Sequence, residues 1–238
     1  MIKTTVILAA GLGTRFGKYT EYIPKGFIDY KGVPMIIRSI ETLLSCGIER
    51  IIIGTGYHQE VYEKLKEKYP QIETCYSPKY AETNSMYTLF NSKEIIGHDD
   101  FLLLESDIIF EKKAISELLQ SEESNIMLVA PVTKFQDQYY VEIDKDNHLV
   151  NCSTNEKALN YCGELVGIHK ISNHFYNLMY NDYKIKCKDY PKLGYEFELL
   201  KIAKEQLPMH VLKINGLQWY EIDDEEDLKY AERNVNIK

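Results

Sequence analysis

The chain has 238 residues, of which 45% are apolar and 27% are charged, and its formal net charge is −8. This composition supports a sizeable folded core and excludes a disordered chain. The acidic balance argues against nucleic acid as a partner, because contact with a phosphate backbone needs a basic face. A small phosphate ligand is not excluded, since it needs only a local cluster of cations.

No apolar run approaches the ~20 residues of a membrane span, and the first residues lack the pattern of a signal peptide. The five cysteines are widely spaced and include no C-x-x-C pair. Neither a disulfide framework nor a zinc site is therefore indicated. We expect a cytoplasmic protein with reduced thiols and no membrane partner.

Apolar strands alternate with amphipathic helices over the first half of the chain. The predicted strands and helices lie, in chain order, at 5–10, 34–46, 50–55, 59–68, 72–76, 86–95, 101–104, 113–120 and 126–130. This alternation predicts an α/β fold with a doubly wound, mostly parallel sheet of Rossmann-like type. Ligands of such folds bind beyond the carboxyl ends of the strands.

The second half begins with a predicted β-hairpin at 139–153 instead of a strand–helix pair. The later elements are a strand at 164–171, a short helix at 173–180, a loop at 181–195, a helix at 196–205, strands at 211–214 and 219–223, and a final helix after Asp224. We expect a single domain, 1–238, divided into a core at 1–131, a small hairpin-containing lobe at 132–205, and a returning strand and C-terminal helix at 206–238.

The first candidate site is the loop after the first strand, which reads G-L-G-T-R-F-G from Gly11 and is followed by Pro24-Lys25. Glycine lets backbone N–H groups approach an anion closely, and Arg15 and Lys25 add positive charge. The loop matches neither the dinucleotide fingerprint G-x-G-x-x-G nor the P-loop pattern. The residues alone therefore indicate a phosphate site without saying which phosphates it holds.

Acidic residues provide the second candidate site. Asp107 follows the buried strand at 101–104, where a metal that carries phosphates would be held. Glu221 and Asp223 alternate in a predicted strand and so share a face. Three such carboxylates suit Mg²⁺. Whether Glu105 belongs to this metal site is left open, because its side chain can point back under the sheet.

The opening of the chain resembles the signature of the nucleotidyltransferases that make nucleoside-diphosphate sugars and alcohols. The matching residues are 8–15, LAAGLGTR, followed by Pro24-Lys25. The sequence LLESD, which ends at Asp107, resembles the second motif of this family, and WYEIDDEEDL at 219–228 resembles the C-terminal end of the bacterial choline-phosphate cytidylyltransferases. The resemblance implies that 1–131 is a nucleotide-binding core and 132–205 an acceptor-binding insertion.

The resemblance also implies roles for single residues. Arg15 would hold the β- and γ-phosphates and Lys25 the α-phosphate and the incoming group, so these two are the expected catalytic residues. Asp107, Glu221 and Asp223 would bind Mg²⁺, the expected cofactor. Thr83, Asn84 and Ser85, which can cap a helix, would bind the base and the ribose. The full set of expected nucleotide-binding residues is Leu8, Ala9, Ala10, Gly11, Gly13, Thr14, Arg15, Lys25, Thr83, Asn84, Ser85 and Asp107.

The acceptor is expected to bind the second half of the chain. A quaternary ammonium favours aromatic faces and a primary amine favours carboxylates, and this half offers both. The hairpin and the stretches ELVGI and GYEFELL are similar to those of the 2-aminoethylphosphonate cytidylyltransferases. The candidate acceptor-binding residues are Tyr139, Glu142, Glu164, Glu196, Glu198 and Trp219.

The resemblance therefore implies a CTP-dependent enzyme that joins CMP to a small amino-alkyl phosphonate, 2-aminoethylphosphonate first, and releases pyrophosphate. Its partners would be CTP and this small acceptor. Phosphocholine or phosphoethanolamine are alternative acceptors, and a sugar 1-phosphate with UTP or dTTP is a further one. An inactive nucleotide-sensing subunit is the alternative from a different class.

Overall fold

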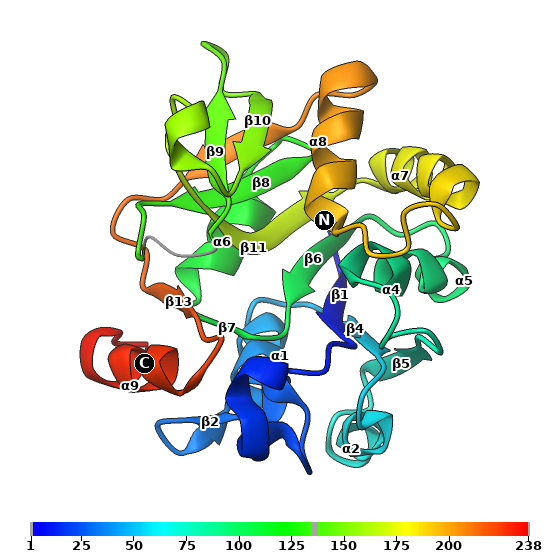
Figure 1. Cartoon of the computed structure of the whole chain (residues 1–238), viewed down its shortest axis with the longest axis vertical. Helices are drawn as coiled ribbons and strands as arrows, with labels where there is room; N and C mark the ends of the chain where they lie inside the picture. Colours follow the sequence, from blue (N-terminus) through cyan, green and yellow to red (C-terminus); the bar gives the residue numbers. More distant parts are fainter. Residues whose placement is uncertain (1, 135–137, 238) are drawn as a thin grey trace.

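A computed structural model describes residues 2–134 and 138–237 of the chain. Nine strands form one mixed sheet at the centre of the molecule (Figure 1). One half of the sheet is parallel and has the strand order β6-β1-β4-β5. Its strands are β1 (Thr4–Ala9), β4 (Arg50–Thr55), β5 (Ile72–Tyr76) and β6 (Phe101–Glu105). Together with the helices on both faces, this half confirms the expected doubly wound fold.

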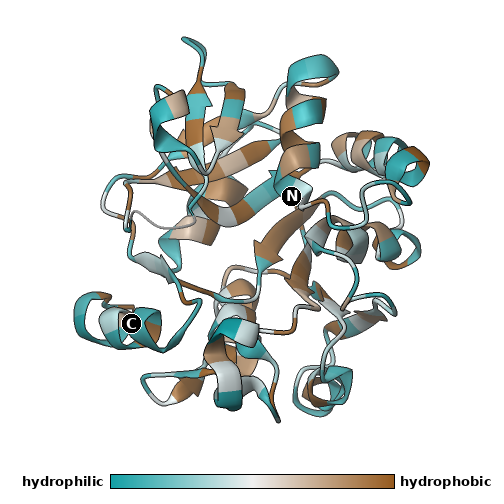
Figure 2. Cartoon of the chain, viewed as in Figure 1, coloured by the Kyte–Doolittle hydropathy of each residue, from teal (hydrophilic) through white to brown (hydrophobic). Residues whose placement is uncertain are grey.

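Helices cover both faces of the sheet. Ile7 and Ala9 of β1 face one apolar cluster, whereas Val6 and Leu8 face the other. The first face carries α1 (Met35–Ser45), α2 (Gln59–Glu63), α3 (Leu65–Lys68) and α6 (Lys113–Gln120), and the second carries α4 (Ser85–Asn91), α5 (Lys93–Ile96), α7 (Asn173–Lys186) and α8 (Tyr195–Glu205). Apolar residues therefore concentrate on the central strands (Figure 2), as strands buried on both faces require.

The other half of the sheet is built on the long strand β11 (Gly163–Ile171), which runs antiparallel to β6. β11 also pairs with β8 (Ile126–Ala130) and β9 (Tyr140–Ile143). The predicted hairpin is present as β9 and β10 (Leu149–Ser153), and β12 (His210–Lys213) lies parallel to β8. This antiparallel half continues the sheet beyond β6, on the side opposite β1 (Figure 1).

A small two-stranded sheet returns the end of the chain to the centre. It consists of β7 (Ile108–Phe110) and β13 (Trp219–Glu221), and it pairs Glu221 with Ile108. The Ile222 N–H donates to the carbonyl of Asp107 at 2.9 Å. The last helix, α9 (Glu225–Asn234), begins at the capping residue Asp224. The remaining elements are η1 (Thr14–Thr20), η2 (Lys25–Phe27), β2 (Asp29–Tyr30), β3 (Val33–Pro34) and η3 (Glu156–Ala158).

Three predicted helices differ in length from the observed ones. The helix expected at 59–68 is divided into α2 and α3, and the helix expected at 86–95 into α4 and α5. α7 continues to Lys186, into the stretch predicted as loop, because Tyr183 is fully buried and packs edge-to-face on Phe90 at 5.4 Å. Within the described residues, no helix is long and apolar enough to cross a membrane.

Candidate active site

A cleft of about 430 Å³ opens above the carboxyl ends of β1 and β6. All twelve residues that were expected to bind nucleotide line it, from the glycine loop through 83–85 to Asp107. The same cleft is also lined by Glu105, Tyr139, Glu196, Glu221 and Asp223. The position agrees with the general rule for open α/β sheets, in which loops at the strand ends form the site.

The glycine loop is shaped by two positions. Gly13 has a φ of +63°, and a Cβ there would lie 3.1 Å from the Cβ of Lys25, so glycine allows both the turn and the close approach of the lysine stem. Thr20 closes the turn by donating its hydroxyl to the Gly13 carbonyl at 2.9 Å. A Cβ on Gly11 would meet no protein atom within 4 Å, so its backbone borders open space where an anion can approach.

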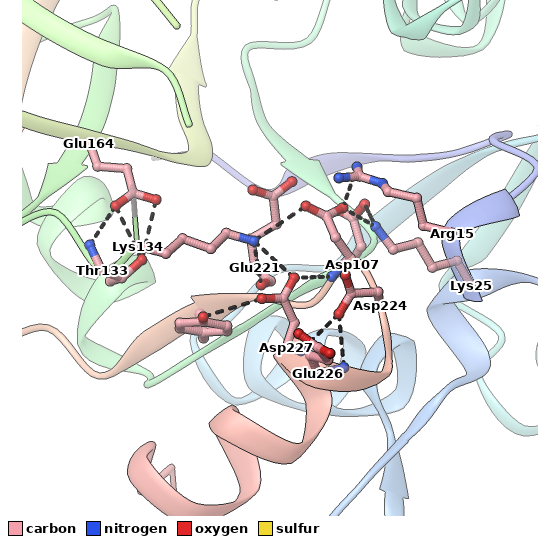
Figure 3. A network of polar contacts seen from close by, with 12 residues as sticks. Arg15, Lys25, Asp107, Thr133, Lys134, Glu164, Glu221, Asp224, Glu226 and Asp227 are labelled. Carbon is pink, nitrogen blue, oxygen red and sulfur yellow. Dashed lines mark hydrogen bonds and ion pairs between the residues drawn. The ribbon is translucent and has the colours of Figure 1, made fainter. Parts of the chain in front are cut away.

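Three cations, which Figure 3 labels, converge on the buried carboxylate of Asp223. Lys25 donates to Asp223 at 2.7 Å and to Asp107 at 2.6 Å, Arg15 donates to Asp223 at 2.7 Å, and Lys134 lies 3.4 Å from it. Burial alone would lower the pKa of Lys25, but Asp107 and Asp223 outweigh it and hold that pKa above the ordinary lysine value. Lys25 is therefore charged throughout the neutral range.

A group of carboxylates lies beside these cations. Glu105, Asp107 and Glu221 each place an oxygen within 4.8 Å of the others. Burial first, and then repulsion from Asp107 and Asp223, raise the pKa of Glu221 to about 8. Such a set of oxygens with excess negative charge fits a hard divalent cation such as Mg²⁺.

The carboxylate group differs from the expected metal set in one member. Asp223 was expected with Asp107 and Glu221, but Glu105 takes its place in the group, while Asp223 pairs with Lys25 and Arg15. Those cations outweigh the effect of burial and hold the pKa of Asp223 below its usual range. A role for Asp223 as a metal ligand stays a prediction.

Glu105 is oriented by groups behind it. The Tyr195 hydroxyl donates to Glu105 Oε1 at 2.5 Å, and His169 Nε2 lies 3.1 Å from the same hydroxyl. Gly167 of β11 has a φ of +78°, and a Cβ there would lie 2.9 Å from Cδ of Glu105. The side chain of Glu105 therefore occupies a space that only glycine leaves, above the sheet and not under it.

The residues at 83–85 form the amino-terminal end of α4. Asn84 accepts a hydrogen bond from the Ser85 N–H at 2.8 Å, and Thr83 donates to the Lys79 carbonyl at 2.6 Å. Ser85 Oγ accepts from the Tyr195 N–H at 3.0 Å. These side chains thus cap the helix and fix the neighbouring loop while they line the cleft, so capping and ligand binding are compatible here.

A smaller cavity of about 170 Å³ continues the cleft toward the antiparallel half of the sheet. It shares Arg15, Glu105, Tyr139, Glu196, Glu221 and Asp223 with the larger cleft. Its inner wall adds Gln138, Glu164, Leu165, Val166 and Trp219. The side chains of the expected acceptor residues Tyr139, Glu164, Glu196 and Trp219 therefore meet at one place.

Two expected acceptor residues line neither cavity. Glu198 is fully buried and pairs with Lys186 at 2.7 Å, because residues two apart on a helix point in nearly opposite directions and Glu196 is the one that faces the cleft. Glu142 lies on β9, where it accepts a hydrogen bond from the Asn160 N–H at 3.4 Å. The structure gives both residues contacts outside the two cavities, and a role in acceptor binding stays a prediction for each.

Some residues in or beside the cleft had no signal in the sequence. Lys134 reaches Asp223 and Asp227 across about ninety residues of chain, with the Asp227 pair at 2.9 Å (Figure 3), and no local pattern marks such a contact. Tyr62 and Tyr80 line the cleft near the glycine loop. Tyr80 lies three residues before the expected nucleotide-binding residue Thr83, and this proximity is the signal that could have indicated it.

A model of the MobA-like NTP transferase domain matches residues 5–171, more than half of the chain. The chain belongs to this nucleotidyltransferase family. It is 32% identical over 110 residues to the 2-aminoethylphosphonate cytidylyltransferase of Lancefieldella rimae, covering 46% of this chain and 45% of that protein. It is 36% identical over 116 residues to the choline-phosphate cytidylyltransferase of Streptococcus pneumoniae, covering 49% of this chain and 50% of that protein.

Among solved structures, the inositol-1-phosphate CTP transferase from T. maritima matches with a TM-score of 0.83 at 18% identity, over 99% of this chain and 98% of the other. This match confirms the fold of the family over the whole chain. The chain spans about half the length of the two curated relatives above, so their names describe longer proteins.

Proposed function

We propose that this protein transfers CMP from CTP to a small amino-alkyl phosphonate, 2-aminoethylphosphonate first, and releases pyrophosphate. The observation that carries the proposal is the single cleft that joins the glycine loop, Arg15 and Lys25 to the carboxylates Glu105, Asp107 and Glu221. One side of such a cleft can hold a triphosphate and the other a divalent cation, as transfer at the α-phosphorus requires.

The transfer needs little covalent work from the protein. The acceptor oxygen would attack the α-phosphorus in line with the leaving pyrophosphate, and it needs no general base because it is already anionic near neutral pH. Lys25 would neutralise charge on the α-phosphate, and Arg15 with the loop amides would hold the β- and γ-phosphates. Mg²⁺, when bound by the three carboxylates, would add positive charge to the same phosphates.

The choice of CTP rests on the two curated relatives above, both of which are named as cytidylyltransferases. Thr83, Asn84 and Ser85 line the cleft beyond the glycine loop, and their hydroxyl and amide groups supply hydrogen bonds suited to a pyrimidine and a ribose. An inactive nucleotide-sensing subunit is disfavoured, because Lys25 and the carboxylate group serve transfer and are not needed for binding alone.

The choice of acceptor rests on the charge of the smaller cavity. Within the described residues, five carboxylates and one cation, Arg15, line it. Glu105 and Glu221 are assigned to the divalent cation and Asp223 pairs with Lys25, which leaves Glu164 and Glu196 for the acceptor. Such a wall favours an acceptor whose far end is a cation, and a primary ammonium can donate to carboxylates. The uncharged hydroxyl groups of a sugar 1-phosphate would gain less there.

Phosphocholine is the second candidate acceptor. The rings of Tyr139 and Trp219 line the same cavity as the carboxylates, and aromatic faces attract a quaternary ammonium. Tyr139 is further backed by Phe197, whose ring lies edge-to-face at 5.9 Å. We rank phosphocholine below the primary amine because the hairpin and the stretch GYEFELL resemble those of the 2-aminoethylphosphonate enzymes.

Pyrophosphate release tests the proposal. The protein is incubated with Mg²⁺, one of CTP, UTP, dTTP or GTP, and one of 2-aminoethylphosphonate, phosphoethanolamine, phosphocholine or glucose 1-phosphate. We expect the fastest release with CTP and 2-aminoethylphosphonate. No release with any pair would overturn the enzyme proposal, and faster release with phosphocholine would overturn the choice of acceptor.

A further inference from the structure

Tyr195 connects three parts of the cleft. It is the first residue of α8 and is fully buried. Its hydroxyl donates to Glu105 in the carboxylate group at 2.5 Å, and its N–H donates to Ser85 Oγ at the start of α4 at 3.0 Å. The next residue, Glu196, lines the smaller cavity. One residue thus touches the cation side and the nucleotide side of the cleft and adjoins the acceptor side.

The chain before Tyr195 strengthens the connection to α4. The Met86 N–H donates to the Leu193 carbonyl at 3.4 Å, and Asn84 Nδ2 donates to the Lys192 carbonyl at the same distance. With the Ser85 contact, three successive residues at the start of α4 bond to the segment that leads into α8. A displacement of either segment would therefore displace the other.

The hydrogen bond to His169 completes the donor and acceptor roles of the Tyr195 hydroxyl. A hydroxyl has one proton, and here it is donated to Glu105, so His169 Nε2 is assigned as the N–H that donates to the tyrosine oxygen. Burial lowers the pKa of His169 to about 3, so the ring is neutral and Nδ1 carries a lone pair. Nδ1 has no hydrogen-bond partner within the described part of the chain.

Gly167 gives the Glu105 side chain its place beside Tyr195. A Cβ at this position would approach Cδ of Glu105 to 2.9 Å, closer than real side chains tolerate. The pairing of β11 with β8 is irregular between Leu165 and His169, so the strand is bent where it passes Glu105. β11 thus contributes both the space for the carboxylate, at Gly167, and the donor behind it, at His169.

From these contacts we propose that Tyr195 is a positioning residue, which holds Glu105 in the carboxylate group that binds the divalent cation and links this group to the start of α4. The link to nucleotide rests on the proposed function, whereas cation binding to the free protein does not. Residues behind a metal ligand commonly set its orientation and change metal affinity by about 10- to 100-fold. A cation that orders Glu105 would, through this contact, also order the start of α4 and so tighten CTP binding. CTP must then tighten cation binding by the same factor, because binding linkage is reciprocal.

Mn²⁺ titration of the nucleotide-free protein, followed by electron paramagnetic resonance, tests the first half. We expect Tyr195→Phe to weaken Mn²⁺ binding about tenfold and Glu105→Gln to weaken it at least as much. The matched control is Tyr176→Phe, which also removes a buried hydroxyl, one that donates to the Leu89 carbonyl at 2.7 Å away from the cleft. This control should leave Mn²⁺ affinity within about twofold, whatever it costs in stability.

Wild-type Mn²⁺ affinity in Tyr195→Phe, or in Glu105→Gln, would overturn the proposal. Wild-type protein that binds no Mn²⁺ would overturn it as well. If Tyr195→Phe fails to fold by circular dichroism, His169→Leu removes the donor behind the hydroxyl instead, and it should weaken Mn²⁺ binding by a smaller factor. Unchanged affinity in that variant would then contradict the arrangement.

The second half is tested by calorimetry of CTP binding with and without Mn²⁺, in the absence of acceptor. We expect the factor by which Mn²⁺ tightens CTP binding to fall several-fold in Tyr195→Phe and to stay unchanged in Tyr176→Phe. An unchanged factor in Tyr195→Phe would refute the link to α4. If Mn²⁺ binds as expected but no pyrophosphate is released with any nucleotide, the proposed function fails while the positioning of Glu105 stands.

Discussion

Lys25 is the cation that pairs with two carboxylates of the cleft. It lies between Asp107 and Asp223, both within 2.7 Å of its ammonium group, and it is largely buried. A triphosphate that enters the cleft offers oxygens of the same charge, so it can replace one carboxylate partner without leaving the lysine unpaired. A buried cation held by exchangeable partners suits a residue that receives phosphate.

Lys25→Met should therefore lower kcat/KM for pyrophosphate release by about 10²- to 10³-fold, the range found for a lost charge-stabilising donor. The fold should persist, because Asp223 keeps Arg15 and Lys134 as partners. Steady-state kinetics and a thermal melt measure the two effects. Lys66→Met, which removes an exposed lysine paired with Glu63, is the control, and near-normal turnover in Lys25→Met would exclude the assigned role.

Glu164 is the residue whose protonation should affect stability. Burial raises its pKa to about 7, against the opposing effect of hydrogen bonds from Thr133. For an acid with a raised folded pKa, the stabilising contribution is complete below the unfolded pKa of 4.5 and is lost as pH rises through about 7. Glu164 therefore favours the folded state at acidic pH and opposes it at alkaline pH, while its contact with the Thr133 N–H at 2.7 Å holds the loop after β8.

Glu164→Gln removes this titration but keeps an oxygen that can accept from Thr133. Relative to wild type, the variant should gain stability between pH 4.5 and pH 8, by up to about 3 kcal/mol. Urea unfolding of both proteins at the two pH values measures the gain. A difference in unfolding free energy that does not change with pH would contradict the raised pKa.

At the scale of elements, β11 shapes the cation side of the cleft through two of its residues, Gly167 and His169. It ends the parallel half by pairing with β6, and it bends at the point where it passes Glu105. Gly167 is the position that permits this arrangement, since it combines a φ of +78° with a close contact to the Glu105 carboxylate. A strand that the sequence predicts from its apolar residues thus shapes the cation side of the cleft through Gly167.

Gly167→Ala should cost more stability than the same change at Gly216. Both glycines have positive φ, at +78° and +73°, but a Cβ on Gly216 meets no atom within 4 Å. Gly216→Ala should cost about 1 kcal/mol from backbone strain alone, and Gly167→Ala at least about 2 kcal/mol more from the clash. Urea unfolding compares them, and equal costs would show that Glu105 moves aside freely.

At the scale of the whole molecule, the cleft is assembled from segments that are far apart in the chain. The glycine loop follows β1, Asp107 follows β6, and Glu221 returns on β13, which pairs with β7 beside Asp107. The acceptor wall comes from the antiparallel half and from α8. Ligand that bridges these segments binds only the folded chain, so it should stabilise the entire molecule.

CTP with Mg²⁺ at 100 times its dissociation constant should stabilise the protein by about 2.7 kcal/mol, which corresponds to a rise of about 5–10 °C in Tm for a chain of this size. At equal concentration, UTP, dTTP and GTP should produce smaller shifts. Differential scanning fluorimetry with each nucleotide provides the comparison. Equal shifts for all four would contradict selection of cytosine by this cleft.

Most of the nucleotide half of the cleft could be predicted from the sequence, because its signals are local. An apolar strand, a run of glycines and Lys25 lie within about 25 residues of one another, and the family signature covers them. The lengths of helices were less predictable: α7 extends to Lys186 because Tyr183 is buried by partners elsewhere in the chain. Local propensity does not contain such packing.

The sequence by itself determined the α/β alternation, the glycine loop with Arg15 and Lys25, and the acidic residues at two strand ends. Only the tertiary structure decided that Glu105, not Asp223, completes the carboxylate group and that Glu196, not Glu198, faces the cleft. These choices depend on the bend of β11, on the rotation of α8 and on the cations that surround Asp223. Each is a contact between residues distant in the chain, for which neighbouring sequence carries no signal.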